Sequence, residues 1–143
     1  MAHMAVGCRK DCIADGRRKP DLRVLDPGHA GWVRRHWGAS YLEEQNLFYR
    51  ALVLSAMLSH RRLTGSTEHE EGMRRLSEGL ATEIDASPHG LLDDYPGQCY
   101  PGDVLTALAI LRKVDGLLGQ DRSAFYARAV RGFEGRLLDR GLV

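Results

Sequence analysis

Residues 40–65, SYLEEQNLFYRALVLSAMLSHRRLTG, decide the fold class of this 143-residue chain. A serine followed three residues later by a glutamate, here Ser40 and Glu43, is the capping-box signature of a helix start. The apolar residues that follow cover more than one face of a helix. We therefore expect a helix from about residue 41 to 63 that packs on several sides and ends at Gly65.

Three more helices are expected downstream. Thr67 opens a second capping box, and Asp103 and Asp121 are expected to be the N-caps of a third and a fourth helix. The third helix is again apolar nearly all round. The second has one narrow apolar stripe, made of Met73, Leu76, Leu80 and Ile84. The fourth also has a narrow stripe, made of Phe125, Ala129, Val130, Phe133 and Leu137.

This order of wide and narrow apolar faces is an internal repeat. The helix stop at Gly65 recurs at Gly119, 54 residues later. We predict an all-α fold in which residues 38–143 form two helical hairpins, each with a wide inner helix and a narrow outer one. A repeat cannot bury its wide face alone, so we expect a fragment of a longer protein whose exposed inner-helix faces self-associate or bind a partner.

Residues 1–37 differ from the rest of the chain. They contain turn-forming pairs but no sustained apolar period, and they carry eight basic and four acidic side chains, a net charge of +4. The remainder carries −3. We expect an irregular basic arm, and no nucleic-acid partner, because the arginine clusters lack aromatic interleaving and a recognised motif.

Composition limits the cofactors and the compartment. The chain is 43% hydrophobic and 27% charged, as in an ordinary globular domain. It has no apparent signal peptide, and its longest apolar run is interrupted by Arg50, so we expect no membrane partner and favour the cytoplasm. No phosphate or dinucleotide motif is present. The pair Cys8 and Cys12 lacks a second pair of zinc ligands, and His69 lacks the second histidine of a zincin helix. We therefore expect no cofactor and no metal.

Residues 92–103, LDDYPGQCYPGD, are the richest in reactive groups. They place three carboxylates, two tyrosines and the Cys99 thiol among prolines and glycines that favour turns. These reactive groups would lie at the N-terminal end of an inner helix, where the helix dipole favours an anion and lowers the pKa of a thiol. The alternative is that Asp103 only caps a helix, that Tyr95 and Tyr100 only pack, and that Cys99 is a small buried apolar residue.

The start of the first inner helix would lie on the same rim. Glu43 has a capping role there, which leaves Glu44 and Asn46 as the better functional candidates. Glu44 could pair with Asp94 or Asp103 as acid and base, because neighbouring carboxylates separate their pKa values.

Three segments of the chain resemble a known family. Residues 41–46 (YLEEQN), 63–65 (LTG) and above all 95–103 (YPGQCYPGD) resemble the α/α-toroid proteins grouped around linalool dehydratase-isomerase. The resemblance implies an incomplete (α/α)6-type barrel of alternating inner and outer helices. It also implies a central cavity in which a hydrophobic alcohol reacts by acid–base chemistry, with Cys99 as the cysteine of the family's Cys-x-Pro segment.

The resemblance therefore implies a lyase or isomerase that acts on a small, largely apolar alcohol, and we expect this fragment alone to be inactive. The expected catalytic residues are Cys99, Asp103 and Asp94, and the expected substrate-binding residues are Tyr95, Tyr100, Glu44 and Asn46. Two alternatives remain open: a six-hairpin glycoside hydrolase that uses Glu44 with Asp94 or Asp103, and a non-catalytic helical interaction module.

Overall fold

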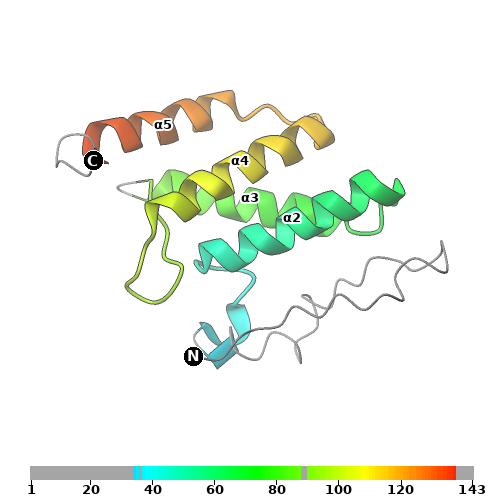
Figure 1. Cartoon of the computed structure of the whole chain (residues 1–143), viewed down its shortest axis with the longest axis horizontal. Coiled ribbons are helices and arrows are strands. Elements are labelled where there is room, and N and C mark those ends of the chain that lie inside the picture. Colours follow the sequence, from blue (N-terminus) through cyan, green and yellow to red (C-terminus); the bar gives the residue numbers. More distant parts are fainter. Residues whose placement is uncertain (1–33, 36, 88–89, 138–143) are drawn as a thin grey trace, which may run out of the picture.

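The computed structural model describes residues 34, 35, 37–87 and 90–137, with side chains described as far as Glu134. Within these residues it contains four α-helices, after a short 3-10 turn, η3 (Gly38–Ser40), and it contains no strand (Figure 1). The helices are α2 (Leu47–Thr64), α3 (Glu70–Ala86), α4 (Pro101–Leu118) and α5 (Ser123–Leu137). The all-α prediction is confirmed. The expected basic arm lies outside the described residues, apart from 34, 35 and 37, which are helical.

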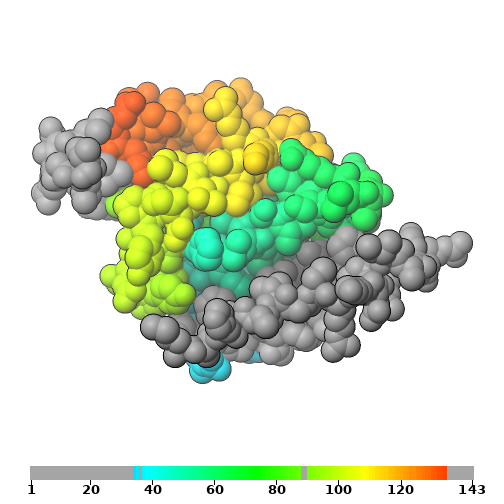
Figure 2. Space-filling model, viewed as in Figure 1, coloured from blue at the N-terminus to red at the C-terminus, as the bar shows by residue number. Residues whose placement is uncertain are grey.

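Helices α2 and α3 pack against each other as a hairpin, whereas α5 packs against α3 more than against α4. Helices α2 and α4 contact each other and run side by side in the same direction, while α3 and α5 run the opposite way (Figure 1). Helix α3 also contacts α2, α4 and α5. The surfaces of α2, α4 and the connector between α3 and α4 all appear on the viewed face of the molecule (Figure 2).

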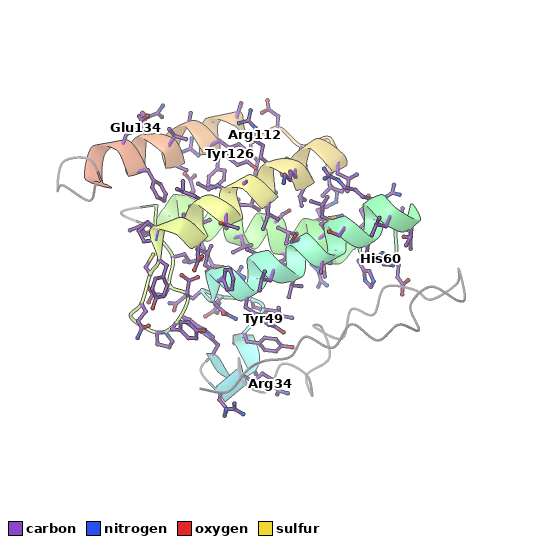
Figure 3. All side chains as sticks on the ribbon, in the orientation of Figure 1. Arg34, Tyr49, His60, Arg112, Tyr126 and Glu134 are labelled. Atoms are coloured by element: carbon purple, nitrogen blue, oxygen red, sulfur yellow. The ribbon has the colours of Figure 1, made fainter. Side chains whose placement is uncertain are left out.

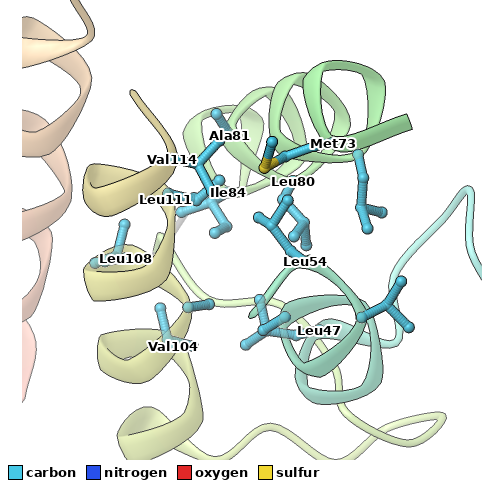
Figure 4. Close-up of a cluster of buried hydrophobic side chains, with 14 of the residues drawn as sticks. Leu47, Leu54, Met73, Leu80, Ala81, Ile84, Val104, Leu108, Leu111 and Val114 are labelled. Carbon is cyan, nitrogen blue, oxygen red and sulfur yellow. The ribbon is translucent and has the colours of Figure 1, made fainter. Parts of the chain in front are cut away.

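The core lies where α2, α3 and α4 meet (Figure 4). The expected stripe of α3 is fully inside, since Met73, Leu76, Leu80 and Ile84 are all buried. Leu54 of α2 and Leu111 of α4 are completely buried as well. Burying each such side chain stabilises the fold by about 1.5–3 kcal/mol, so this three-helix contact is the main source of stability.

An ion-pair cluster joins α5 to the other helices. Asp115, buried near the end of α4, accepts a hydrogen bond from Arg122 and one of 2.6 Å from the Tyr126 hydroxyl. Arg122 also binds Glu78 of α3 at 2.6 Å. Burial and the neighbouring Asp115 carboxylate raise the pKa of Tyr126, so its hydroxyl remains a proton donor to that carboxylate.

The predicted helix stops are confirmed, but the start of α2 was predicted wrongly. Gly65 and Gly119 both have left-handed backbone, at φ +71° and +66°, and end α2 and α4. Helix α2 begins only at Leu47, because Gln45 and Asn46 are also left-handed, at φ 46° and 45°, and interrupt the chain before it. Ser40 therefore caps no helix.

The starts of α3 and α4 also differ from the expected ones. Helix α3 begins at Glu70, after a turn in which the Ser66 hydroxyl accepts the Glu68 N–H. Helix α4 begins at Pro101, which suits a first helical position because that position needs no N–H donor. Asp103 is thus inside the first turn of α4 and is not its N-cap.

Several apolar side chains remain exposed. Phe48 and Leu52 of α2 and Leu105 of α4 are 39%, 45% and 53% exposed. The predicted stripe of α5 is buried at Phe125 and Ala129, but the prediction was wrong for Val130, which is half exposed.

No helix in the described part of the chain is both long and apolar enough to cross a membrane.

Candidate functional site

The connector that leads into α4 is held by a tight turn. In residues 95–98, the Gln98 N–H donates to the Tyr95 carbonyl at 2.8 Å, and Gly97 has φ +76°. Proline at the second position and a left-handed glycine at the third are the sequence pattern of a type II turn. The Asp93 carboxylate accepts the Gly97 N–H at 2.8 Å and closes the turn.

Asp94 ties this connector to the starts of α2 and α4. Its Oδ1 accepts the Phe48 N–H of α2 at 2.8 Å, and its Oδ2 accepts the Tyr100 N–H at the start of α4 at 3.2 Å. The Trp37 indole donates to the Asp94 carbonyl at 3.3 Å. The side chain is 4% exposed, and burial raises the pKa of the carboxyl, although its two backbone donors oppose that rise. Asp94 therefore holds two helix N-termini together.

Cys99 lies beside this carboxylate but is not an activated thiolate. Burial, followed by the charge of Asp94, raises the pKa of the Cys99 thiol, and Asp93 and Asp103 raise it further. A backbone hydrogen bond from Leu92 opposes the rise only in part. The expectation of a lowered pKa was wrong, because burial of the thiol, together with the three nearby carboxylates, disfavours the thiolate. The half-buried thiol stays protonated and can act as a proton donor.

The structure brings the three predicted catalytic residues together. Asp103, half-buried in the first turn of α4, acts electrostatically on both Asp94 and Cys99. Tyr95 and Tyr100 flank the group and are 36% and 49% exposed. The Tyr100 hydroxyl donates to the side-chain carbonyl of Gln98 at 3.1 Å.

Glu44 and Asn46 belong to a different set of contacts. Asn46 is buried, and its side-chain amide donates to the Tyr41 carbonyl at 2.7 Å, so it fixes the backbone ahead of α2. Glu44 is exposed, and its charge acts on Arg50. The capping role expected for Glu43 was wrong, since no capping box forms at this residue.

Arg50 is a buried charge that the sequence did not single out. It is 1% exposed, pairs with Glu83 of α3 at 2.8 Å, and donates to the Gln45 carbonyl at 2.8 Å. Glu83 also accepts the Gln45 N–H at 2.7 Å, so this ion pair supports the left-handed backbone before α2. Burial lowers the pKa of Arg50, and Glu83 opposes the change. A Cβ at Gly79 would lie 3.0 Å from the guanidinium, so glycine makes room for it.

A groove of about 660 Å³ lies against α2 and α3 near Arg50. Its apolar lining includes Val53, Met57 and Leu76, and its charged lining includes Arg50, Glu68, His69 and Arg75. None of the seven site residues predicted from the sequence lines it. In the described part of the chain, one group has the donor set for a metal ion: His60, Glu68 and His69, beside this groove.

Comparison of this chain with known protein families, with curated proteins and with solved structures finds no match.

Proposed function

We propose that this chain is part of an α/α toroid and that the intact protein is a lyase or isomerase that acts on a small, largely apolar alcohol. The observation that carries the proposal is the grouping of Cys99, Asp94 and Asp103 at the adjoining N-terminal ends of α2 and α4. The parallel, side-by-side arrangement of these two helices supports their role as neighbouring inner helices.

The proposed chemistry is removal of water from the alcohol. The protonated Cys99 thiol donates its proton to the hydroxyl group as the C–O bond breaks, and the Asp103 carboxylate takes a proton from the adjacent carbon as the double bond forms. Proton transfer from Asp103 back to the Cys99 thiolate restores both groups. The reverse steps, with water added at another carbon, isomerise the alcohol.

The remaining predicted residues have supporting roles in this proposal. Both oxygens of Asp94 already accept backbone N–H groups, so Asp94 is a positioning residue. Tyr95 and Tyr100 supply an exposed aromatic wall for an apolar substrate. Glu44 and Asn46 lie at the start of α2 and would border the same cavity in a closed ring.

Turnover of a tertiary allylic alcohol by the intact protein tests the proposal. We expect Cys99→Ala and Asp103→Asn each to lower the rate by about 100-fold or more, the usual contribution of a general acid or base. The double variant Cys8→Ser, Cys12→Ser should keep full activity. Full activity of Cys99→Ala, with unchanged helicity by circular dichroism, would remove the thiol from the mechanism. Cleavage of an aryl glycoside that depends on Glu44 and Asp103 would favour the hydrolase instead.

A second candidate, a helical interaction module, is favoured by the exposed apolar side chains. Phe48 and Leu52 lie one turn apart on α2, and Leu105 lies on the adjoining helix α4. Exposed apolar side chains that lie next to each other are typical of interaction surfaces. In this candidate the two hairpins bind a second copy of the chain through α2 and α4.

A further inference from the structure

Two histidines and a glutamate from separate elements meet at the C-terminal end of α2. His60 lies in the last turns of α2 (Figure 3). Glu68 and His69 belong to the segment that leads into α3. The nearest ligand atoms of the three side chains all lie within 4.8 Å of one another. The two imidazole rings are 5.0 Å apart between centroids and are inclined at 68°.

His60 is incompletely satisfied as a structural residue. Its side chain is 3% exposed, and its buried Nδ1 atom has no hydrogen-bond partner in the described part of the chain. A buried polar atom without a partner destabilises a fold by about 1–3 kcal/mol, so such atoms usually have a further ligand. An edge-to-face contact with His69 accounts for the packing of the ring but gives this nitrogen no partner.

We propose that His60, Glu68 and His69 bind one zinc ion. Two imidazoles and one carboxylate are a donor set that zinc takes in open sites, where a fourth position holds water or a substrate. Tetrahedral coordination at about 2.0 Å places ligand atoms about 3.3 Å apart, so the three side chains must approach by at most about 1.5 Å. Glu68 is exposed and His69 is half-buried, so changes of side-chain rotamer can supply this movement.

The site adjoins the groove between α2 and α3. Glu68 and His69 are among the residues that line this groove of about 660 Å³, together with the apolar Met57 and the cationic Arg75. A zinc ion bound there would present its open position beside a space large enough for a small molecule. This zinc site involves none of the connector residues and is independent of the proposed dehydration chemistry.

Isothermal titration calorimetry with zinc chloride tests the proposal in a Cys8→Ser, Cys12→Ser background, which removes the thiols of the arm. We expect one zinc ion per chain. His69→Ala and Glu68→Gln should each weaken binding at least about tenfold, because loss of even an outer partner of a ligand has that effect. Glu71→Gln and His89→Ala, which change a groove carboxylate and a histidine outside the trio, are the matched controls and should bind zinc normally.

Cobalt substitution gives a second readout that does not depend on affinity. Cobalt(II) bound by nitrogen and oxygen ligands gives visible ligand-field bands without the near-ultraviolet thiolate-to-metal band, and His69→Ala should abolish those bands. Absence of stoichiometric zinc binding would overturn the proposal. So would binding that the Glu68 and His69 variants leave unchanged, or that occurs only when Cys8 and Cys12 are present.

Discussion

At the scale of single residues, Asp94 connects the sequence-distant parts of the fold. It accepts the Phe48 N–H across 46 residues of chain and the Tyr100 N–H within its own connector. These N–H groups lie at helix N-termini, where no intrahelical acceptor exists. One buried carboxylate thus replaces the local caps that were expected from Ser40 for α2 and from Asp103 for α4.

Replacement of Asp94 should destabilise the fold. Asp94→Ala leaves both N–H groups without their acceptor, and we expect a loss of about 2–3 kcal/mol in the free energy of unfolding at pH 7. Urea unfolding followed by circular dichroism measures this loss. The control is Asp93→Asn, because that side chain accepts the exposed Gly97 N–H within its own turn and bridges no helices. An Asp94→Ala variant as stable as the wild type would contradict the bridging role.

The pH dependence of Asp94 has a defined sign. Burial raises its pKa in the folded state, so the folded chain holds the proton more tightly than the unfolded chain does. Protonated Asp94 therefore contributes its full stability at pH values below its pKa in the unfolded chain. This contribution is lost as the pH rises through its pKa in the folded chain. Compared with Asp94→Asn in urea titrations, the wild type should lose relative stability as pH rises from 3.5 to 7. A constant difference would contradict the raised pKa.

At the scale of the elements, the C-terminal ends of the helices are the feature that the sequence predicts best. Gly65 and Gly119 end α2 and α4 in left-handed conformations, which glycine adopts without a steric penalty. The starts were predicted less well. A turn does begin at Ser40, since the Ser40 carbonyl accepts the Glu43 N–H. The left-handed residues Gln45 and Asn46 prevent this turn from continuing into α2.

Two glycines near the end of α4 should respond to alanine in opposite directions. Gly119 has φ +66°, so Gly119→Ala should destabilise the fold by about 1 kcal/mol. Gly116 is helical, and a Cβ there would meet no atom within 4 Å, so Gly116→Ala should stabilise it by about 0.5–1 kcal/mol. Thermal unfolding of both variants gives the comparison, and a shift of the same sign in both would contradict the assigned end of α4.

At the scale of the whole molecule, the four helices leave part of their apolar surface uncovered. The described chain buries the stripe of α3 but exposes Leu52 and Leu105 on the neighbouring helices α2 and α4. In the proposed toroid a further hairpin would cover such a face, and a second copy of this chain would do the same.

Self-association through this face can be measured directly. We expect the apparent mass in light scattering to rise with concentration, and Leu52→Glu and Leu105→Glu to reduce the rise because a charge replaces an apolar contact. Val130→Glu, on the half-exposed surface of α5, is the control. All three positions are exposed, so stability should change by less than about 0.5 kcal/mol. A monomeric wild type at all concentrations would exclude the second copy as the partner.

The sequence by itself determined the four helices, the stops at Gly65 and Gly119 and the buried stripe of α3, because apolar period and left-handed glycine are local properties. The tertiary structure alone decided where α2 begins, since its N-terminal amides are capped from a distant connector, and it alone reversed the expected pKa shift of Cys99 by burying the thiol beside the buried Asp94. It also buried Arg50 and brought His60 to Glu68 and His69. Contacts of this kind depend on how helices pack, which no spacing within one segment records.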